Sequence, residues 1–76
     1  MNSYHSIYQK MRRATSVPRS VEYWRGVRAA LAHRLAGIPI CLPYEPGCTE
    51  YDAWRAGLDA GAAEAAARAA GGEVAA

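Results

Sequence analysis

The sequence has no phenylalanine, and only two cysteines, two methionines and two tryptophans among its 76 residues. Alanine supplies much of the 51% apolar content, so the large side chains available for a core are mainly aromatic, with a few aliphatic ones. A domain of this size buries only about 60% of the surface that its unfolded chain exposes. We therefore expect one small domain over residues 1–76, with a thin stability margin that a partner or a homodimer would improve.

Long apolar runs are also missing. The longest uncharged stretch, residues 35–44, contains Gly37, Pro39 and Pro43 and is far shorter than the roughly 20 residues that cross a bilayer. The first 16 residues place their basic side chains after the apolar ones and contain no apolar block, which is the wrong order for a secretory signal. These absences predict a cytoplasmic protein with no membrane segment.

The net charge of +2 hides an uneven distribution. Residues 1–34 hold seven Lys or Arg against one Glu, whereas residues 35–76 hold two Arg against six Asp or Glu. Charges separated in this way steer partners electrostatically. Solubilising charge on exposed helix faces is the alternative interpretation.

The first segment predicts an amphipathic helix. Tyr4, Ile7, Tyr8 and Met11 follow the spacing of one helical face. Pro18 disfavours helical geometry in the residue before it, so this helix ends within the N-terminal extension, residues 1–19.

A second helix is expected from Ser20, as N-cap, to Ala36, with Gly37 as its stop. Gly26 inside this helix costs about 1 kcal/mol relative to alanine, so we expect it to allow close approach of a neighbouring segment. One face carries the large apolar side chains Trp24, Val27, Leu31 and Leu35.

A third helix is expected from Thr49, since Asp52 three residues later approximates a capping box. Gly57 and Gly61 lie four residues apart, a spacing that lets another backbone approach. Beyond Leu58 the apolar residues are almost all alanine, so we expect fraying after about Ala70.

Together these patterns predict an all-α fold of three helices. Helices two and three are expected to form an antiparallel pair, joined by a loop rich in Pro and Cys. The pair makes a two-helix core over residues 20–66, followed by a frayed tail over residues 67–76.

The cysteines suggest chemistry, but their context argues against it. A disulfide between Cys41 and Cys48 is geometrically possible, yet a reducing cytoplasm favours free thiols. Zinc would need two further ligands, and neither His5 nor His33 stands in a ligand motif. Cys41 and His33 would offer a nucleophile and a base, but three short helices provide no deep cavity. We expect no metal, no cofactor and no enzyme activity.

Recognition is the remaining function class. Basic side chains in the first half suit phosphate contact, and the aromatic rings among them, Tyr4, Tyr8 and Tyr23, suit stacking on unpaired bases. Core packing is the alternative role for these tyrosines. The candidate binding residues are Lys10, Arg12, Arg13, Arg19, Arg25, Arg28 and Arg34.

Short motifs in the connector and the third helix resemble the ribosome modulation factor family. The matching pieces are Ala36-Gly37, then Cys41-Leu42-Pro43-Tyr44, then Trp54-Arg55-Ala56-Gly57-Leu58 with Gly61. The resemblance covers roughly residues 24–64. It implies a small non-enzymatic helical protein that binds ribosomal RNA, with a structural motif formed by Gly37, Cys41, Pro43, Tyr44, Trp54 and Gly57. Since a staple and a metal site are disfavoured, we expect Cys41, Pro43 and Tyr44 to form the buried hinge of the two-helix unit.

The acidic, alanine-rich second half departs from the strong basicity of ribosome binders and leaves a second hypothesis open. A phage or mobile-element inhibitor, such as an anti-CRISPR protein or an RNA polymerase inhibitor, would share the small size and the separated charge. It would enter the basic nucleic-acid channel of a CRISPR effector or a polymerase. Its contact surface would then be acidic, formed by Glu45, Glu50, Asp52 and Asp59.

Overall fold

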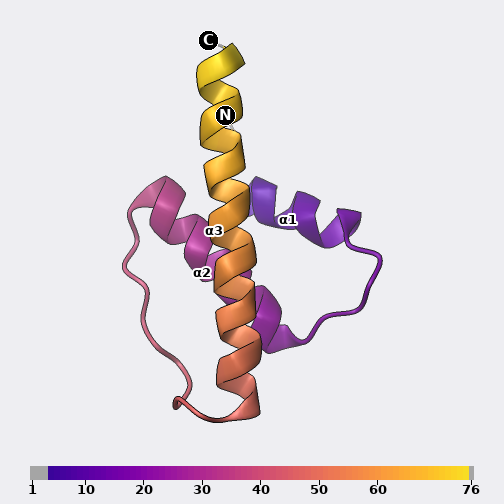
Figure 1. Ribbon diagram of the computed structural model, residues 1–76, viewed down its shortest axis with the longest axis vertical. Helices are drawn as coiled ribbons and strands as arrows, with labels where there is room; N and C mark the ends of the chain where they lie inside the picture. The colour runs from indigo at the N-terminus through magenta and orange to yellow at the C-terminus, as the bar shows by residue number, and fades with distance from the viewer. Residues whose placement is uncertain (1–3, 76) are drawn as a thin grey trace.

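Three helices make up the described part of the chain, which contains no strand (Figure 1). The computed structural model describes the backbone of residues 4–75 and the side chains of residues 4–69. The helices are α1 (Tyr4–Ala14), α2 (Val21–Ala36) and α3 (Thr49–Ala75). The predicted all-α fold of three helices is therefore confirmed.

Local signals at the ends of α2 act as expected. The Ser20 hydroxyl oxygen accepts a hydrogen bond from the Tyr23 N–H at 3.2 Å and so caps the helix. Gly37 ends it in the left-handed region at φ 71°, where its N–H donates to the His33 carbonyl oxygen. A residue with a Cβ is strained in this conformation, which explains glycine at this position.

The start of α3 differs from the expectation. The Cys48 thiol, rather than the Thr49 hydroxyl, caps this helix: its sulfur accepts from the Tyr51 N–H at 3.4 Å and donates to the Glu45 carbonyl oxygen at 3.0 Å. Both cysteines are free thiols. Ser3 or Asn2 is the N-cap that the sequence predicts for α1, and both lie outside the described residues.

The core joins all three helices. Its buried members are Ile7 of α1, Ala65 of α3, and Trp24, Val27 and Leu31 of α2. Tyr4, Tyr8 and Met11 pack against this cluster, so the predicted apolar face of α1 is confirmed. Trp54 is only 3% exposed and is a core residue.

Glycines allow α2 and α3 to pack closely. A Cβ on Gly26 would collide with the backbone of Trp54, and a Cβ on Gly57 would collide with the backbone of Tyr23. The expected close approach at Gly26 is thus confirmed, and the neighbour is α3.

The predicted antiparallel pairing is wrong. Gly57 lies against Tyr23 and Val27, and Gly61, one turn later, lies against Val27 and Ala30. Contacts therefore advance along both helices in the same direction, and Figure 1 shows α2 and α3 both rising from the lower end of the molecule.

The length of the connector, residues 37–48, explains this direction. Antiparallel neighbours are joined by loops of about 2–5 residues, whereas this connector has no helix or strand and reaches about 40 Å when extended. Since α2 has 16 residues and is about 24 Å long, the connector can return along its whole length before α3 begins.

Two further expectations fail in this region. The connector is not a buried hinge, because Cys41 and Pro43 are exposed and Tyr44 is half-buried. Leu35, expected on the core face of α2, is 41% exposed; it lies over Ala65, Ala66 and Ala69 of α3, whose small side chains leave a hollow of about 150 Å³.

The C-terminal part of α3 is helical to Ala75. Fraying after Ala70 concerns residues whose side chains lie outside the described set, and it stays a prediction.

Candidate functional site

The most distinctive surface lies where α1 meets the first half of α2. A hollow of about 270 Å³ opens there, which we call the arginine groove; it is lined by Tyr8, Arg12, Arg19, Val21, Trp24, Arg25 and Arg28. Four of its seven lining residues are arginines, and all four are exposed.

Helix geometry places these arginines. Val21, Arg25 and Arg28 follow one another at helical spacing on α2, beside the buried stripe that contains Trp24. Arg12 comes from the last turn of α1, next to the half-buried Tyr8. Because Ile7 and Tyr8 pack against α2, helix α1 forms one side of the groove, and Arg25 and Arg28 of α2 form the other.

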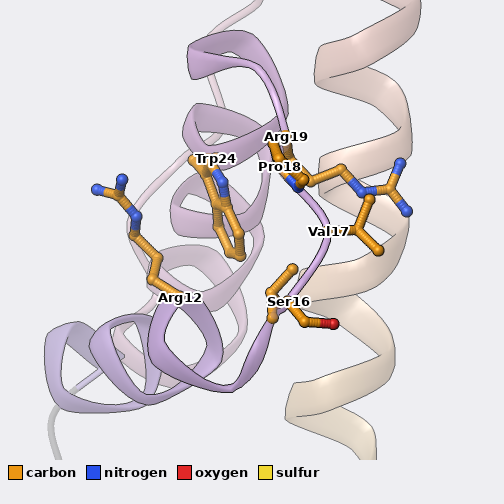
Figure 2. Close-up of a pocket in the computed structure, with 7 residues that line it drawn as sticks. Arg12, Ser16, Val17, Pro18, Arg19 and Trp24 are labelled. Carbon is orange, nitrogen blue, oxygen red and sulfur yellow. The ribbon is translucent and has the colours of Figure 1, made fainter.

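A second hollow, of about 310 Å³, adjoins the groove and shares Arg12, Arg19 and Trp24 with it. Its other wall is the linker of residues 15–18. Figure 2 shows Arg12 and Arg19 extending on opposite sides of Trp24, with Ser16 and Val17 across from Arg12. The two hollows thus form a continuous depression around the indole ring.

Two of the arginines contact aromatic rings. The Arg12 guanidinium carbon lies 5.6 Å from the ring centre of Trp24 and 5.9 Å from that of Tyr8. The Arg19 guanidinium carbon lies 4.8 Å from the ring centre of Tyr23. These cation–π contacts hold the guanidinium groups near the groove without neutralising them.

Arg25 is held by a different contact. Its Nη1 donates a hydrogen bond to the Tyr44 hydroxyl oxygen at 3.0 Å, which links the connector to α2.

None of the four groove arginines has a carboxylate partner in the described part of the chain. The only ion pair found there joins Arg68 to Glu64 on α3. The dipole of α2 adds to the positive potential, since its N-terminal turn begins at Val21 beside Arg19. The arginine groove is therefore a concentrated and unneutralised positive surface.

The other predicted basic residues lie elsewhere. Lys10 and Arg13 are exposed on α1 and line neither hollow of the depression. Arg34 lines the small hollow at the far end of α2. The structure thus brings together Arg12, Arg19, Arg25 and Arg28, and separates these from Lys10, Arg13 and Arg34.

The predicted acidic surface is not gathered in the same way. Glu45 belongs to the connector, Glu50 and Asp52 to the first turn of α3, and Asp59 lies two turns beyond Asp52. Arg55 stands between Asp52 and Asp59 on the same side of the helix. A hydrogen bond from Arg55 Nη1 to the Tyr51 hydroxyl at 3.2 Å, together with the charges of Tyr51 and Asp59, raises the pKa of Arg55. Arginine is protonated at physiological pH in any case, so this face has a cation at its centre.

Two groove residues, Trp24 and Val21, are not predicted as site residues by the sequence pattern. Trp24 is expected only in the core, although it lies one helical turn before the exposed Arg28. The sequence also assigns Tyr44, which contacts Arg25 outside the groove lining, to no basic surface. The spacing of Val21, Arg25 and Arg28 was the available signal for Val21, but nothing local predicts the contact of Tyr44 with α2.

The residues considered for chemistry are not assembled. His33 Nδ1 lies 3.1 Å from the carbonyl oxygen of Ile38, and Cys41 is exposed. Among the described residues, no group of three or more His, Cys, Asp or Glu side chains is placed to hold a metal ion. Within the same residues, no helix has the length and apolar character needed to span a bilayer.

Neither protein-family models, nor curated proteins, nor solved structures yield a match to this chain.

Proposed function

We propose that this chain is a non-enzymatic binding protein that acts in the cytoplasm on a nucleic-acid machine, by placing its arginine groove on RNA phosphates. The observation that supports this best is the set of four exposed arginines, without carboxylate partners, around one depression. Arginine presents a planar fork of donors that matches phosphate oxygens.

The ribosome is the first candidate among ribonucleoproteins. Its support comes from the motif resemblance over residues 24–64, whereas support for RNA comes from the groove. Four groove residues, Tyr8, Arg12, Arg19 and Val21, precede the matching segment, whereas Trp24, Arg25 and Arg28 lie within it. The groove therefore extends beyond the segment that carries the resemblance.

The inhibitor hypothesis has weaker support. The four predicted acidic residues do not share one face: they are Glu45, Glu50, Asp52 and Asp59. Only Asp52 and Asp59 lie on the same side of α3, and Arg55 stands between them. An acidic surface built to enter a basic channel would present its carboxylates together.

Co-sedimentation with ribosomes in a sucrose gradient tests the proposal. We expect the protein to travel with ribosomes at low salt and to dissociate steeply as salt rises, because phosphate contacts release counterions. Protein that stays at the top of the gradient at low salt would exclude the ribosome.

A matched pair of variants tests the groove itself. Arg28→Gln removes a groove charge, and Arg13→Gln makes the same substitution at an exposed position that does not line the groove. We expect Arg28→Gln to weaken binding and to reduce the slope of log K against log salt by about 0.7–0.9. Equal losses for both variants would show that net charge, and not the groove, carries the binding.

A further inference from the structure

The floor of the arginine groove is aromatic. Trp24 is 8% exposed, and its ring lines both hollows of the depression. Tyr8 meets it edge to face, with ring centres 6.1 Å apart and planes at 83°. Trp24 is almost fully buried, so the ring surface that the groove offers belongs mainly to the half-buried Tyr8.

Arg12 lies on this ring surface. Its guanidinium contacts both rings and has no carboxylate partner among the described residues. A cation–π contact at an exposed site is weak, whereas a bidentate pair with phosphate is stronger. An approaching phosphate therefore draws Arg12 from the rings, and the faces it covered become free at the moment of binding.

The size of the groove decides what occupies those faces. The hollow of about 270 Å³ continues into the neighbouring one of about 310 Å³, so the depression has room for a flat ring system and its phosphate, within the range of about 300–1,000 Å³ usual for small-ligand sites. In a duplex the base faces are already stacked on one another, so a duplex offers only phosphates here. In a single strand the bases are unstacked and can lie on aromatic side chains.

We infer that the arginine groove binds single-stranded nucleic acid, with one unpaired base stacked on the face of Tyr8 that Arg12 covers and its edge against Trp24, and with Arg12 transferred to the adjacent phosphate. This inference rests on the proposed function and names its ligand class. The remaining groove arginines then contact neighbouring phosphates of the same strand.

Fluorescence anisotropy with three labelled probes tests this: a single-stranded oligonucleotide, an abasic strand of the same length and charge, and the matching duplex. At one salt concentration, we expect the base-bearing strand to bind roughly 5- to 150-fold tighter than the abasic strand, as one stacked base gives. Equal affinity of the two strands, both sensitive to salt, overturns the inference and leaves the proposed function standing. Failure of all three probes to bind overturns both.

Intrinsic fluorescence gives a second measurement. The Trp54→Phe variant leaves Trp24 as the only tryptophan, after circular dichroism has shown that the variant is folded. We expect the base-bearing strand to quench Trp24 and the abasic strand and duplex to leave it nearly unchanged. Quenching of equal size by all three probes would contradict base stacking.

Two tyrosines of α1 provide a matched pair. Tyr8→Leu removes the ring in the groove, whereas Tyr4→Leu makes the same change on the same face of α1 outside the groove. We expect Tyr8→Leu to reduce the affinity ratio between base-bearing and abasic strands several-fold, and Tyr4→Leu to preserve it. A ratio that survives Tyr8→Leu excludes Tyr8 from stacking and overturns the inference as stated.

Discussion

Gly57 has no side chain, and that absence lets α3 touch the backbone of α2. A Cβ at this position would collide with the carbonyl group of Tyr23, which belongs to a helix backbone and cannot rotate away. Gly26 makes the reciprocal contact with Trp54. A Cβ on Gly61 would likewise collide with the Val27 carbonyl oxygen, so three glycines set the distance between the helices.

Gly57→Ala tests this contact by the sign of its effect. Helix propensity alone would stabilise the variant by about 1 kcal/mol, whereas overpacking costs about 1–3 kcal/mol. We expect the collision to dominate, so that the Tm measured by circular dichroism falls by several degrees.

The control is Ala63→Gly, at an exposed position of α3. It measures the change in Tm that the difference in helix propensity between Ala and Gly causes in this helix, without any collision. A rise in the Tm of Gly57→Ala would show that the helices are farther apart than described.

Cys48 acts through its sulfur as a hydrogen-bonding atom. Its thiol accepts from the Tyr51 N–H and donates to the Glu45 carbonyl, so it fulfils the role that serine usually has at an N-cap. Cys41, by contrast, is exposed in the connector.

The cap predicts an ordered series of stabilities in thermal denaturation. We expect Cys48→Ser to be at least as stable as the parent, and Cys48→Ala to lose about 0.5–1 kcal/mol, at the low end for N-caps because sulfur is a weak acceptor. Cys41→Ala is the control and should stay within about 0.5 kcal/mol. If Cys48→Ala and Cys41→Ala behave alike, the thiol is not a cap.

At the scale of elements, α1 is attached to the rest of the molecule through one stripe. Ile7 is 5% exposed and lies in the shared core with Trp24. The same attachment places Tyr8 and Arg12 at the wall of the arginine groove. Stability and binding are therefore linked in this helix.

Ile7→Ala tests that link. We expect a loss of about 2–5 kcal/mol in the free energy of unfolding measured with urea, together with weaker oligonucleotide binding, because the groove loses one wall. Val17→Ala, at a linker position that is 60% exposed, should leave stability within about 0.5 kcal/mol. Unchanged binding by a folded Ile7→Ala protein would show that α1 is not part of the groove.

Elements whose limits are set by neighbouring residues could be predicted from the sequence. Ser20 and Gly37 define α2 through local hydrogen bonds and backbone conformation, and the stripe from Tyr4 to Met11 defines the buried side of α1. The Cys48 cap was missed because thiols rarely replace hydroxyls there. Leu35 was expected to be buried because its spacing places it on the apolar face of α2. Spacing does not show how far along that face the neighbouring helix covers it, and Leu35 is 41% exposed.

At the scale of the whole molecule, the direction of the α2–α3 pair could not be predicted. Gly26 beside Trp24, and Gly57 after Trp54, indicate the faces through which the two helices pack, but the same faces would meet in either direction. The arginine groove also depends on how the helices pack, since Arg12 and Arg28 belong to different helices. Only their packing distinguishes Arg12 and Arg28 from Arg13 and Arg34, which have the same chemistry.

Nuclear Overhauser effects test the direction of pairing. A Cβ on Gly61 would lie 2.9 Å from the Ala30 Cβ, so we expect cross-peaks between the Gly61 Hα protons and the Ala30 methyl group. An antiparallel pair that crosses at Gly26 would instead place Gly61 near the first turn of α2. Cross-peaks from Gly61 to Glu22, without any to Ala30, would refute the arrangement.

The connector has a consequence for how this chain folds. Because α2 and α3 run in the same direction, their first contact joins residues far apart in the sequence, such as Tyr23 and Gly57, and closes the connector as a loop. The entropy of that closure is lost before the glycine contacts form, so folding should be slower than for a helical hairpin of equal length. The rate-limiting barrier then depends on the length and stiffness of residues 37–48, where Pro39, Pro43 and Pro46 restrict the chain before any helix has packed.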